Sequence, residues 1–295
     1  MSYETPQALR MALEDRLLNQ SRATGVSIDR LRRRVVFERT VARLQSAEPG
    51  VWVLKGGMAL EVRLRDDARV TKDIDLGLRD EVTEDQRLRA RLVEARTDDP
   101  FDDRFVLLAG PVARLNEDGA GHVTWRSSVV ANLAGKPFGS VKLDVSPRRH
   151  ELDQTDAVAL PNSLAFAGID TPTIEIIDVN RHAAEKFHAM LKDFGDRENT
   201  RVRDLLDLVI LREHGLLDAQ ALSLAVRRVW RERDDTTPPA RLAPFPSNWP
   251  LRYEQLTAEH DVAAASFSDA AALAARLWNE MVRTGENRPP SQPNL

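Results

Sequence analysis

The sequence predicts an α/β (α+β) protein in which a mixed sheet with its helices comes first and a helical bundle follows. Two observations lead to this prediction. Short runs rich in β-branched residues, bounded by Gly, Asn and Pro, recur between residues 51 and 146. From Asp178 onward the apolar residues recur instead at the spacing of amphipathic helices. We therefore expect an α/β core with N-terminal helices in residues 1–170 and a helical domain in residues 171–295.

The predicted elements of the first part alternate between helices and strands. Helices are expected over residues 5–20, 28–47, 58–65 and 81–95. Strands are expected over residues 51–57, 73–78, 104–110, 121–135, 139–146 and 173–178. The polar segment 147–163 is bounded by prolines, so we interpret it as a long loop.

The predicted elements of the second part are helical. Asp178 is placed to cap the first of these helices, and Gly215 is placed to end the second. Helices are expected over residues 179–194, 201–215, 217–233, 252–262 and 268–283. The segment 235–250 holds five prolines, so we expect a linker or an extended loop there.

The composition is that of an ordinary globular protein, with 42% apolar and 30% charged residues in 295. No apolar run is long enough to cross a bilayer, and the N-terminus lacks the basic and then apolar pattern of a signal peptide. The sequence has no cysteine, which excludes disulfides, thiolate zinc sites and cysteine nucleophiles. We therefore expect a cytoplasmic protein without a membrane partner.

The net charge of −4 bears on nucleic-acid binding, because proteins that bind many phosphates are usually basic. Any such contact would need a local basic patch. Two arginine clusters could supply one: Arg30, Arg32, Arg33, Arg34 and Arg39, and Arg227, Arg228, Arg231 and Arg233. Each cluster is equally compatible with a solvated helix face whose arginines pair with acidic neighbours.

The stretch 54–78 carries the pattern that predicts chemistry. Gly56 and Gly57 join an apolar strand to a helix, where the backbone N–H groups at the helix start suit a phosphate. Asp73 and Asp75 lie two residues apart on a predicted strand, so both carboxylates share one face while Ile74 enters the core. Two carboxylates pointing the same way repel each other unless a cation neutralises them.

A third carboxylate, Asp144, is isolated on an otherwise apolar later strand and is the candidate to complete a metal site. Hard oxygen ligands suit Mg²⁺ or Mn²⁺. Two such ions, roughly 3.5–4 Å apart, can stabilise the attacking and leaving oxygens of an in-line phosphoryl displacement. These residues therefore predict a metal-dependent transferase.

The motif order resembles the AbiEii/AbiGii toxin family of nucleotidyltransferases, and in particular its mycobacterial MenT branch. The resemblance covers residues 35–215 and rests on four motifs. They are Lys55-Gly56-Gly57-Met58-Ala59-Leu60, then Arg69-Val70-Thr71-Lys72-Asp73-Ile74-Asp75, then Lys186, and then the pair Asp204 and Asp207. Met58 departs from the pattern, because many relatives have Thr or Ser there. The resemblance implies a DNA-polymerase-β-like nucleotidyltransferase core.

The resemblance also implies roles for these residues. Asp73, Asp75 and Asp144 would be the metal ligands, and Lys186 would act with them in catalysis by reaching the triphosphate. The nucleotide would contact Gly56, Gly57, Met58, Arg69, Thr71, Lys186, Asp204 and Asp207. Taken alone, Lys186 could equally be a surface lysine, and the Asp204 and Asp207 pair an exposed stripe beside Arg201 and Arg203.

The implied activity is transfer of a nucleoside monophosphate from an NTP to the 3′ end of tRNA or to another RNA, with release of pyrophosphate. Such a reaction would block translation and growth, and a cognate antitoxin would be the partner protein. Two alternatives stay open. The same fold could modify a protein or a small molecule, or the chain could be a nucleotide-binding module that no longer turns over.

Overall fold

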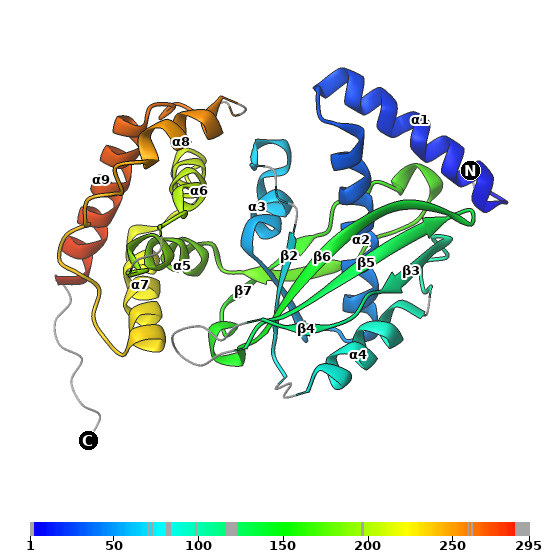
Figure 1. Cartoon of the computed structure of the whole chain (residues 1–295), viewed down its shortest axis with the longest axis horizontal. Coiled ribbons are helices and arrows are strands. Elements are labelled where there is room, and N and C mark those ends of the chain that lie inside the picture. Colours follow the sequence, from blue (N-terminus) through cyan, green and yellow to red (C-terminus); the bar gives the residue numbers. More distant parts are fainter. Residues whose placement is uncertain are drawn as a thin grey trace. The chain divides into compact units, whose positions relative to one another are not determined.

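The computed structural model describes residues 3–69, 71, 73–80, 84–97, 99–115, 123–195, 198–258, 260 and 262–286 (Figure 1). The chain forms two compact units. The first consists of Met1–Arg63 and Val70–Ile177, and the second of Leu64–Arg69 and Asp178–Leu295. The short segment Leu64–Arg69 therefore belongs with the C-terminal helices, although it lies in sequence within the first unit.

The elements of the first unit include both helices and strands. The helices are α1 (Pro6–Thr24), α2 (Ile28–Ala47), α3 (Gly56–Leu64) and α4 (Asp85–Thr97). The strands are β1 (Trp52–Lys55), β2 (Asp73–Leu78), β3 (Phe105–Ala109), β4 (Ala113–Arg114), β5 (Trp125–Leu133), β6 (Lys136–Pro147), β7 (Thr155–Ala159) and β8 (Thr173–Ile177).

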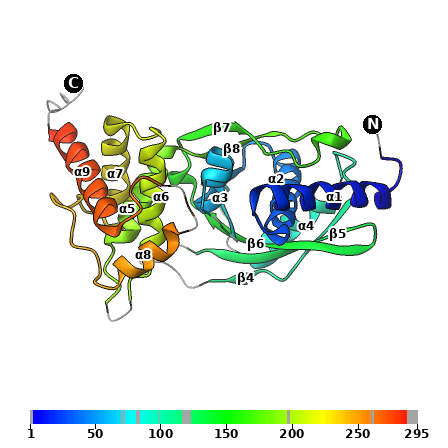
Figure 2. The ribbon, with the colours of Figure 1, turned by 90° about the horizontal axis from the view of Figure 1, so that it is seen from above.

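In the described part of the chain these strands form an eight-stranded mixed sheet. Its order is β3-β5-β6-β2-β1-β8-β7, with β4 beside β5. The pairs β2–β6 and β1–β8 are parallel, and the remaining pairs are antiparallel. The prediction of a mixed sheet is confirmed. Seen from above, β7 and β8 run along one side of α2 while β5 and β6 run along the other (Figure 2).

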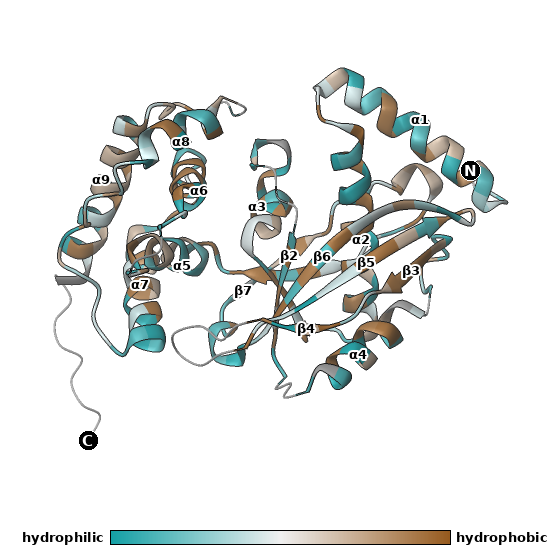
Figure 3. Ribbon diagram, in the orientation of Figure 1, coloured by the Kyte–Doolittle hydropathy of each residue, from teal (hydrophilic) through white to brown (hydrophobic). Residues whose placement is uncertain are grey.

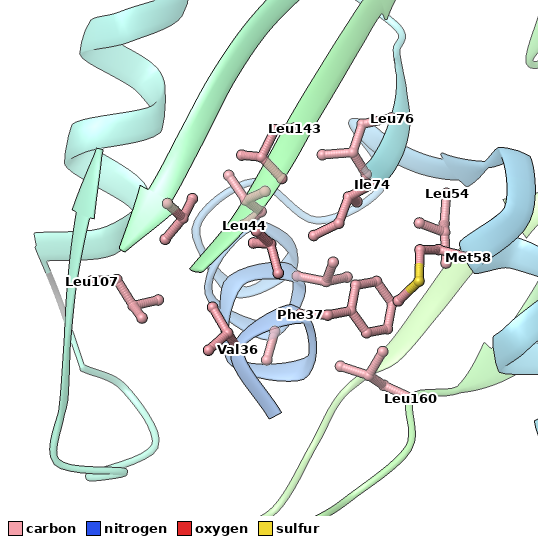
Figure 4. Close-up of a cluster of buried hydrophobic side chains, with 14 of the residues drawn as sticks. Val36, Phe37, Leu44, Leu54, Met58, Ile74, Leu76, Leu107, Leu143 and Leu160 are labelled. Atoms are coloured by element: carbon pink, nitrogen blue, oxygen red, sulfur yellow. The ribbon is translucent and has the colours of Figure 1, made fainter. Parts of the chain in front are cut away.

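The core of the first unit lies between α2 and the sheet. Val36, Phe37 and Leu44 of α2 point toward Ile74 and Leu143 of the central strands (Figure 4). The strands β5 and β6 carry apolar and polar residues along their lengths (Figure 3). Burial alternates along β5, which follows from the period of two in a strand with one covered face. The other face of these strands is therefore available for polar residues.

Two details of the first unit differ from the predictions. The segment 147–163 is not a continuous loop, because Thr155–Ala159 forms β7 and pairs antiparallel with β8. Its residues are half-buried or exposed, as expected for an edge strand, so no apolar alternation marks it. The helix α3 begins at Gly56 itself rather than after the two glycines.

The second unit is helical, as predicted. Its helices are α5 (Val179–Leu191), α6 (Val202–Glu213), α7 (Ala219–Asp234), α8 (Trp249–Thr257) and α9 (Phe267–Glu286). Asp178 caps α5 by accepting a hydrogen bond of 2.8 Å from the Arg181 backbone N–H. An edge-to-face aromatic cluster fills the core, with Trp278 lying 5.1 Å from Phe187 and 5.6 Å from Trp230 between ring centroids. None of the helices in the described residues is long and apolar enough to span a bilayer.

Candidate active site

Three carboxylates lie on one face of the sheet in the first unit. Asp75 of β2 is the direct partner of Asp144 of β6 in the parallel pair, and Asp73 lies two residues before Asp75. Ile74 between them is 1% exposed and enters the core. Residues paired on neighbouring strands point the same way, and the strands are roughly 4.8 Å apart. The sheet therefore brings the three predicted metal ligands together.

The first residue of α3 lies against the Asp75 carboxylate. Gly56 has a φ of +59°, and a β-carbon built on it would fall 1.8 Å from Oδ2 of Asp75. The register of β1 and β2 causes this approach, because Lys55 pairs directly with Asp75. A glycine is therefore required here both for its backbone angle and for space. The arrangement sets the N-terminus of α3 beside the carboxylates.

The other predicted residues of the first unit lie close by in sequence but differ in environment. Met58 is 5% exposed, and its side chain packs in the core beside Leu54 (Figure 4). Its backbone N–H is thus the group left to contact a ligand at the helix start. Gly57 is buried in the same turn, and Thr71 is half-buried just before β2.

Arg126 is a residue of this face that the sequence analysis did not identify. It lies opposite Asp144 in the β5–β6 pair and donates two hydrogen bonds to it, from Nε to Oδ1 at 2.7 Å and from Nη2 to Oδ2 at 2.6 Å. The hydrogen bond to Asp144 raises the pKa of Arg126, and the charges of Asp144, Asp73 and Asp75 raise it further. The guanidinium thus lies within the field of all three carboxylates.

The remaining predicted residues form a buried network in the second unit. Asp207 of α6 is fully buried and accepts two hydrogen bonds from Arg69, one from Nε at 2.7 Å and one from Nη2 at 3.0 Å. Lys186 of α5 donates to Asp207 at 2.6 Å and to Asp204 at 3.2 Å. Lys186 is 5% exposed. The alternatives of a surface lysine and an exposed acidic stripe are therefore wrong for Lys186 and Asp207.

This network shifts the pKa values of its members. Burial alone would raise the pKa of Asp207, but the charges of Lys186 and Arg69 outweigh it and lower the value to about 2. Burial likewise opposes the charge of Lys186, yet Asp207 and Asp204 raise its pKa above the ordinary value. The two cations and two carboxylates together carry no net charge, which makes their burial tolerable.

The sequence model of the family described as nucleotidyl transferase AbiEii toxin, type IV TA system, matches residues 39–291. The chain belongs to the AbiEii family of nucleotidyltransferase toxins. The resemblance seen in the sequence motifs is thus confirmed. Membership in the AbiEii family makes the chain a nucleotidyltransferase toxin of a type IV toxin–antitoxin system, and implies an NTP substrate and a cognate antitoxin.

One solved structure supports the fold of this AbiEii family member, and a second is more distantly similar. The nucleotidyltransferase toxin MenT4 from Mycobacterium tuberculosis is 17% identical, with a TM-score of 0.50, over 93% of this chain and 90% of that one. JHP933 from Helicobacter pylori is 15% identical, with a TM-score of 0.47, over 88% of this chain and 97% of that one. Among curated proteins, no sequence matches this chain.

The AbiEii family implies a divalent metal, and the carboxylates on the sheet fit one in their chemistry. Asp73, Asp75 and Asp144 supply carboxylate oxygens from adjacent strand positions, the donor set that Mg²⁺ and Mn²⁺ prefer. Within the described residues, however, no three such side chains already converge as metal ligands. Both oxygens of Asp144 are instead hydrogen-bonded to Arg126.

The two arginine clusters have different environments. In α2, Arg32 pairs with Glu14 at 2.8 Å, Arg34 pairs with Glu61, and Arg39 is fully buried. These arginines hold α2 in place and are not a free basic patch. In α7, by contrast, Arg227, Arg228 and Arg231 are exposed, whereas Arg233 pairs with Glu185 at 3.2 Å.

Proposed function

We propose that this AbiEii toxin is a Mg²⁺-dependent enzyme that transfers a nucleoside monophosphate from an NTP to RNA, with the 3′ end of tRNA as the acceptor. Pyrophosphate is the second product. A nucleotide added to that end prevents aminoacylation, so the reaction blocks translation and growth in the cytoplasm. The observation that carries the proposal is the alignment of Asp73, Asp75 and Asp144 on one face of adjacent parallel strands.

The three carboxylates share two tasks in this proposal. Asp73, Asp75 and Asp144 would hold the metal ions, and Asp144 would also act on the acceptor. When bound, Mg²⁺ neutralises charge on the triphosphate and on the leaving pyrophosphate. Asp144 takes the proton of the attacking acceptor hydroxyl. Positioning and charge stabilisation account for most of the rate in such reactions.

The reaction is a single in-line displacement. The acceptor hydroxyl oxygen forms a bond to the α-phosphorus while the bond from that phosphorus to the bridging oxygen of the β-phosphate breaks. The electron pair of the broken bond leaves with pyrophosphate. The free N–H groups at the start of α3, at Gly56, Gly57 and Met58, are the proposed phosphate contacts on the sheet side.

The motif residues outside the sheet also belong to the proposal, as residues that act on the nucleotide. They are Arg69, Thr71, Lys186, Asp204 and Asp207. The buried ion-pair network supports a positioning task for Asp207, because it holds Arg69 and Lys186 in one fixed arrangement. Lys186 is the group proposed to offset triphosphate charge.

An RNA acceptor is supported by the exposed arginines of α7, since phosphates pair with free guanidinium groups. The overall charge of −4 means that such contacts have to be local. The choice of tRNA follows from the family resemblance of the sequence motifs.

The test is incubation of the purified protein with Mg²⁺, total tRNA and each NTP labelled at its α-phosphate. An Asp73→Asn variant and the exposed-site variant Asp153→Asn serve as negative and positive controls. Label on tRNA with the wild type and Asp153→Asn, and none with Asp73→Asn, would support the proposal. Pyrophosphate release without labelled RNA would favour a protein or small-molecule acceptor, and nucleotide binding without pyrophosphate would favour a binding module.

A further inference from the structure

The position of Arg126 opposite Asp144 depends on an irregularity of the β5–β6 hairpin. Near the turn Leu133 pairs with Lys136 and Asn132 with Pro137, but Ala131 then pairs with Gly139. A regular continuation of the first register would set Arg126 opposite Leu143. The β-bulge adds one residue to β6 and shifts the partner to Asp144. A bulge of this kind changes which side chains meet across the strands.

The positive charge of the Arg126 guanidinium offsets the charges of the carboxylates, as a divalent cation would. Three carboxylates on neighbouring strand positions repel one another, and a cation among them relieves that repulsion. Arg126 satisfies both oxygens of Asp144 in a two-pronged pair, the geometry in which arginine binds carboxylates most strongly. While this pair is formed, another cation has to compete with Arg126 for Asp144.

We propose that Arg126 is a gate on the metal site, pairing with Asp144 in the metal-free enzyme and releasing it when a divalent ion binds. The inference rests on the proposed metal-dependent function. Arg126 thereby lowers the apparent affinity for metal, because the free ion has to compete for a carboxylate already engaged. It also stabilises the metal-free sheet by offsetting the charges of Asp73, Asp75 and Asp144.

The exposure of the two partners allows this exchange. The Arg126 side chain is 42% exposed while that of Asp144 is 14% exposed. A released guanidinium can therefore turn into solvent without leaving a buried cation, whereas Asp144 remains at the site. The half-exposed pair is also weak enough to be displaced, since solvent screens it.

The experiment measures Mn²⁺ affinity without nucleotide, from the electron paramagnetic resonance signal of the free ion. Arg126→Met should bind Mn²⁺ about 1.5- to fivefold more tightly than the wild type, the range expected for release of a solvent-screened ion pair. Without metal, Arg126→Met should have a lower melting temperature than the wild type. Saturating Mn²⁺ should raise the melting temperature of the variant more than that of the wild type.

Lys142→Met is the matched control, because Lys142 is an exposed cation opposite Asp73 in the β2–β6 register, whereas Arg126 is the residue bonded to Asp144. It should change Mn²⁺ affinity less than Arg126→Met does. Equal affinities of the wild type and Arg126→Met, or an equal gain in Lys142→Met, would overturn the gate and leave the metal site standing. Absence of Mn²⁺ binding in every variant would instead overturn the metal site, and the gate with it.

Discussion

Gly56 lies so close to Asp75 that a β-carbon on the glycine would fall 1.8 Å from the Asp75 carboxylate. The change Gly56→Ala therefore has to move either the start of α3 or the carboxylate. Because both belong to the proposed site, we expect a loss of nucleotidyl transfer of about 100-fold or more, as for other displaced catalytic groups. The rate of pyrophosphate release under saturating NTP measures it.

Gly135→Ala is the control for the backbone effect alone. Gly135 has a φ of +70° and nothing within 4 Å of a built β-carbon, so alanine there adds strain without a collision. The strain costs about 1 kcal/mol of unfolding free energy. If the two variants lost the same stability and both kept full activity, the close approach of Gly56 and Asp75 would have no catalytic meaning.

Removing one charge from the carboxylate face should greatly slow catalysis while leaving the fold intact. We expect Asp75→Asn and Asp144→Asn each to lower the rate by about 100-fold or more, the loss seen when one charge-stabilising group is removed. Asp153→Asn, at an exposed position outside the site, should keep the wild-type rate. Single-turnover kinetics with a labelled NTP report the chemical step, and an unchanged rate in Asp144→Asn would remove it from the mechanism.

The buried Asp207 should make stability depend on pH at the acid end. Its pKa is about 2 in the folded protein, against about 3.9 for an aspartate in an unfolded chain. A lowered folded pKa means that the stabilisation is complete above the unfolded value and disappears as pH falls from about 4 to about 2. The loss amounts to roughly 2.6 kcal/mol, and urea unfolding at a series of pH values measures it.

Asp207→Asn should weaken this acid dependence and lower the unfolding free energy at neutral pH by about 3–5 kcal/mol, because Arg69 and Lys186 lose the buried carboxylate that they share and only Asp204 still neutralises Lys186. Asp204→Asn is the matched comparison, since Asp204 holds the same lysine at the longer distance of 3.2 Å. Asp204→Asn should lower the unfolding free energy by less than Asp207→Asn does. Equal effects of the two changes would show that the network depends on Asp207 no more than on Asp204.

The exposed arginines of α7 should contribute to RNA affinity and not to the chemical step. We expect Arg228→Glu together with Arg231→Glu to raise KM for tRNA while kcat stays near the wild-type value, because phosphate contacts position the substrate. The salt dependence of binding should become shallower. Arg32→Gln in α2 is the control, since that arginine is already paired with Glu14. Unchanged KM and salt dependence would point to another acceptor surface.

Local patterns in the sequence were sufficient to predict which strands carry the carboxylates. Asp73 and Asp75 alternate with apolar neighbours, and such alternation defines a face without knowledge of the partner strand. Asp144 is recognisable in the same way, as one acidic residue in an apolar strand. The helical second unit follows from periodicity over long segments, where sequence patterns are most informative.

The features that the sequence did not reveal depend on pairing between strands. An arginine at position 126 is typical of a solvated strand face, and its contact with Asp144 arises from the bulge in the hairpin. The strand β7 was missed because an edge strand buries little and keeps a polar sequence. The burial of Lys186 likewise depends on Asp207, which lies on the following helix.

The segment Leu64–Arg69 has a practical consequence for dissecting this protein. Because this segment belongs with the C-terminal helices, a polypeptide that begins at Asp178 lacks part of its own unit. Such a fragment retains the Asp207 carboxylate but not the Arg69 side chain that donates two hydrogen bonds to it. The boundary at Asp178 is therefore not a place where the gene can be divided cleanly, and a helical fragment would need Leu64–Arg69 grafted onto it to keep its interior complete.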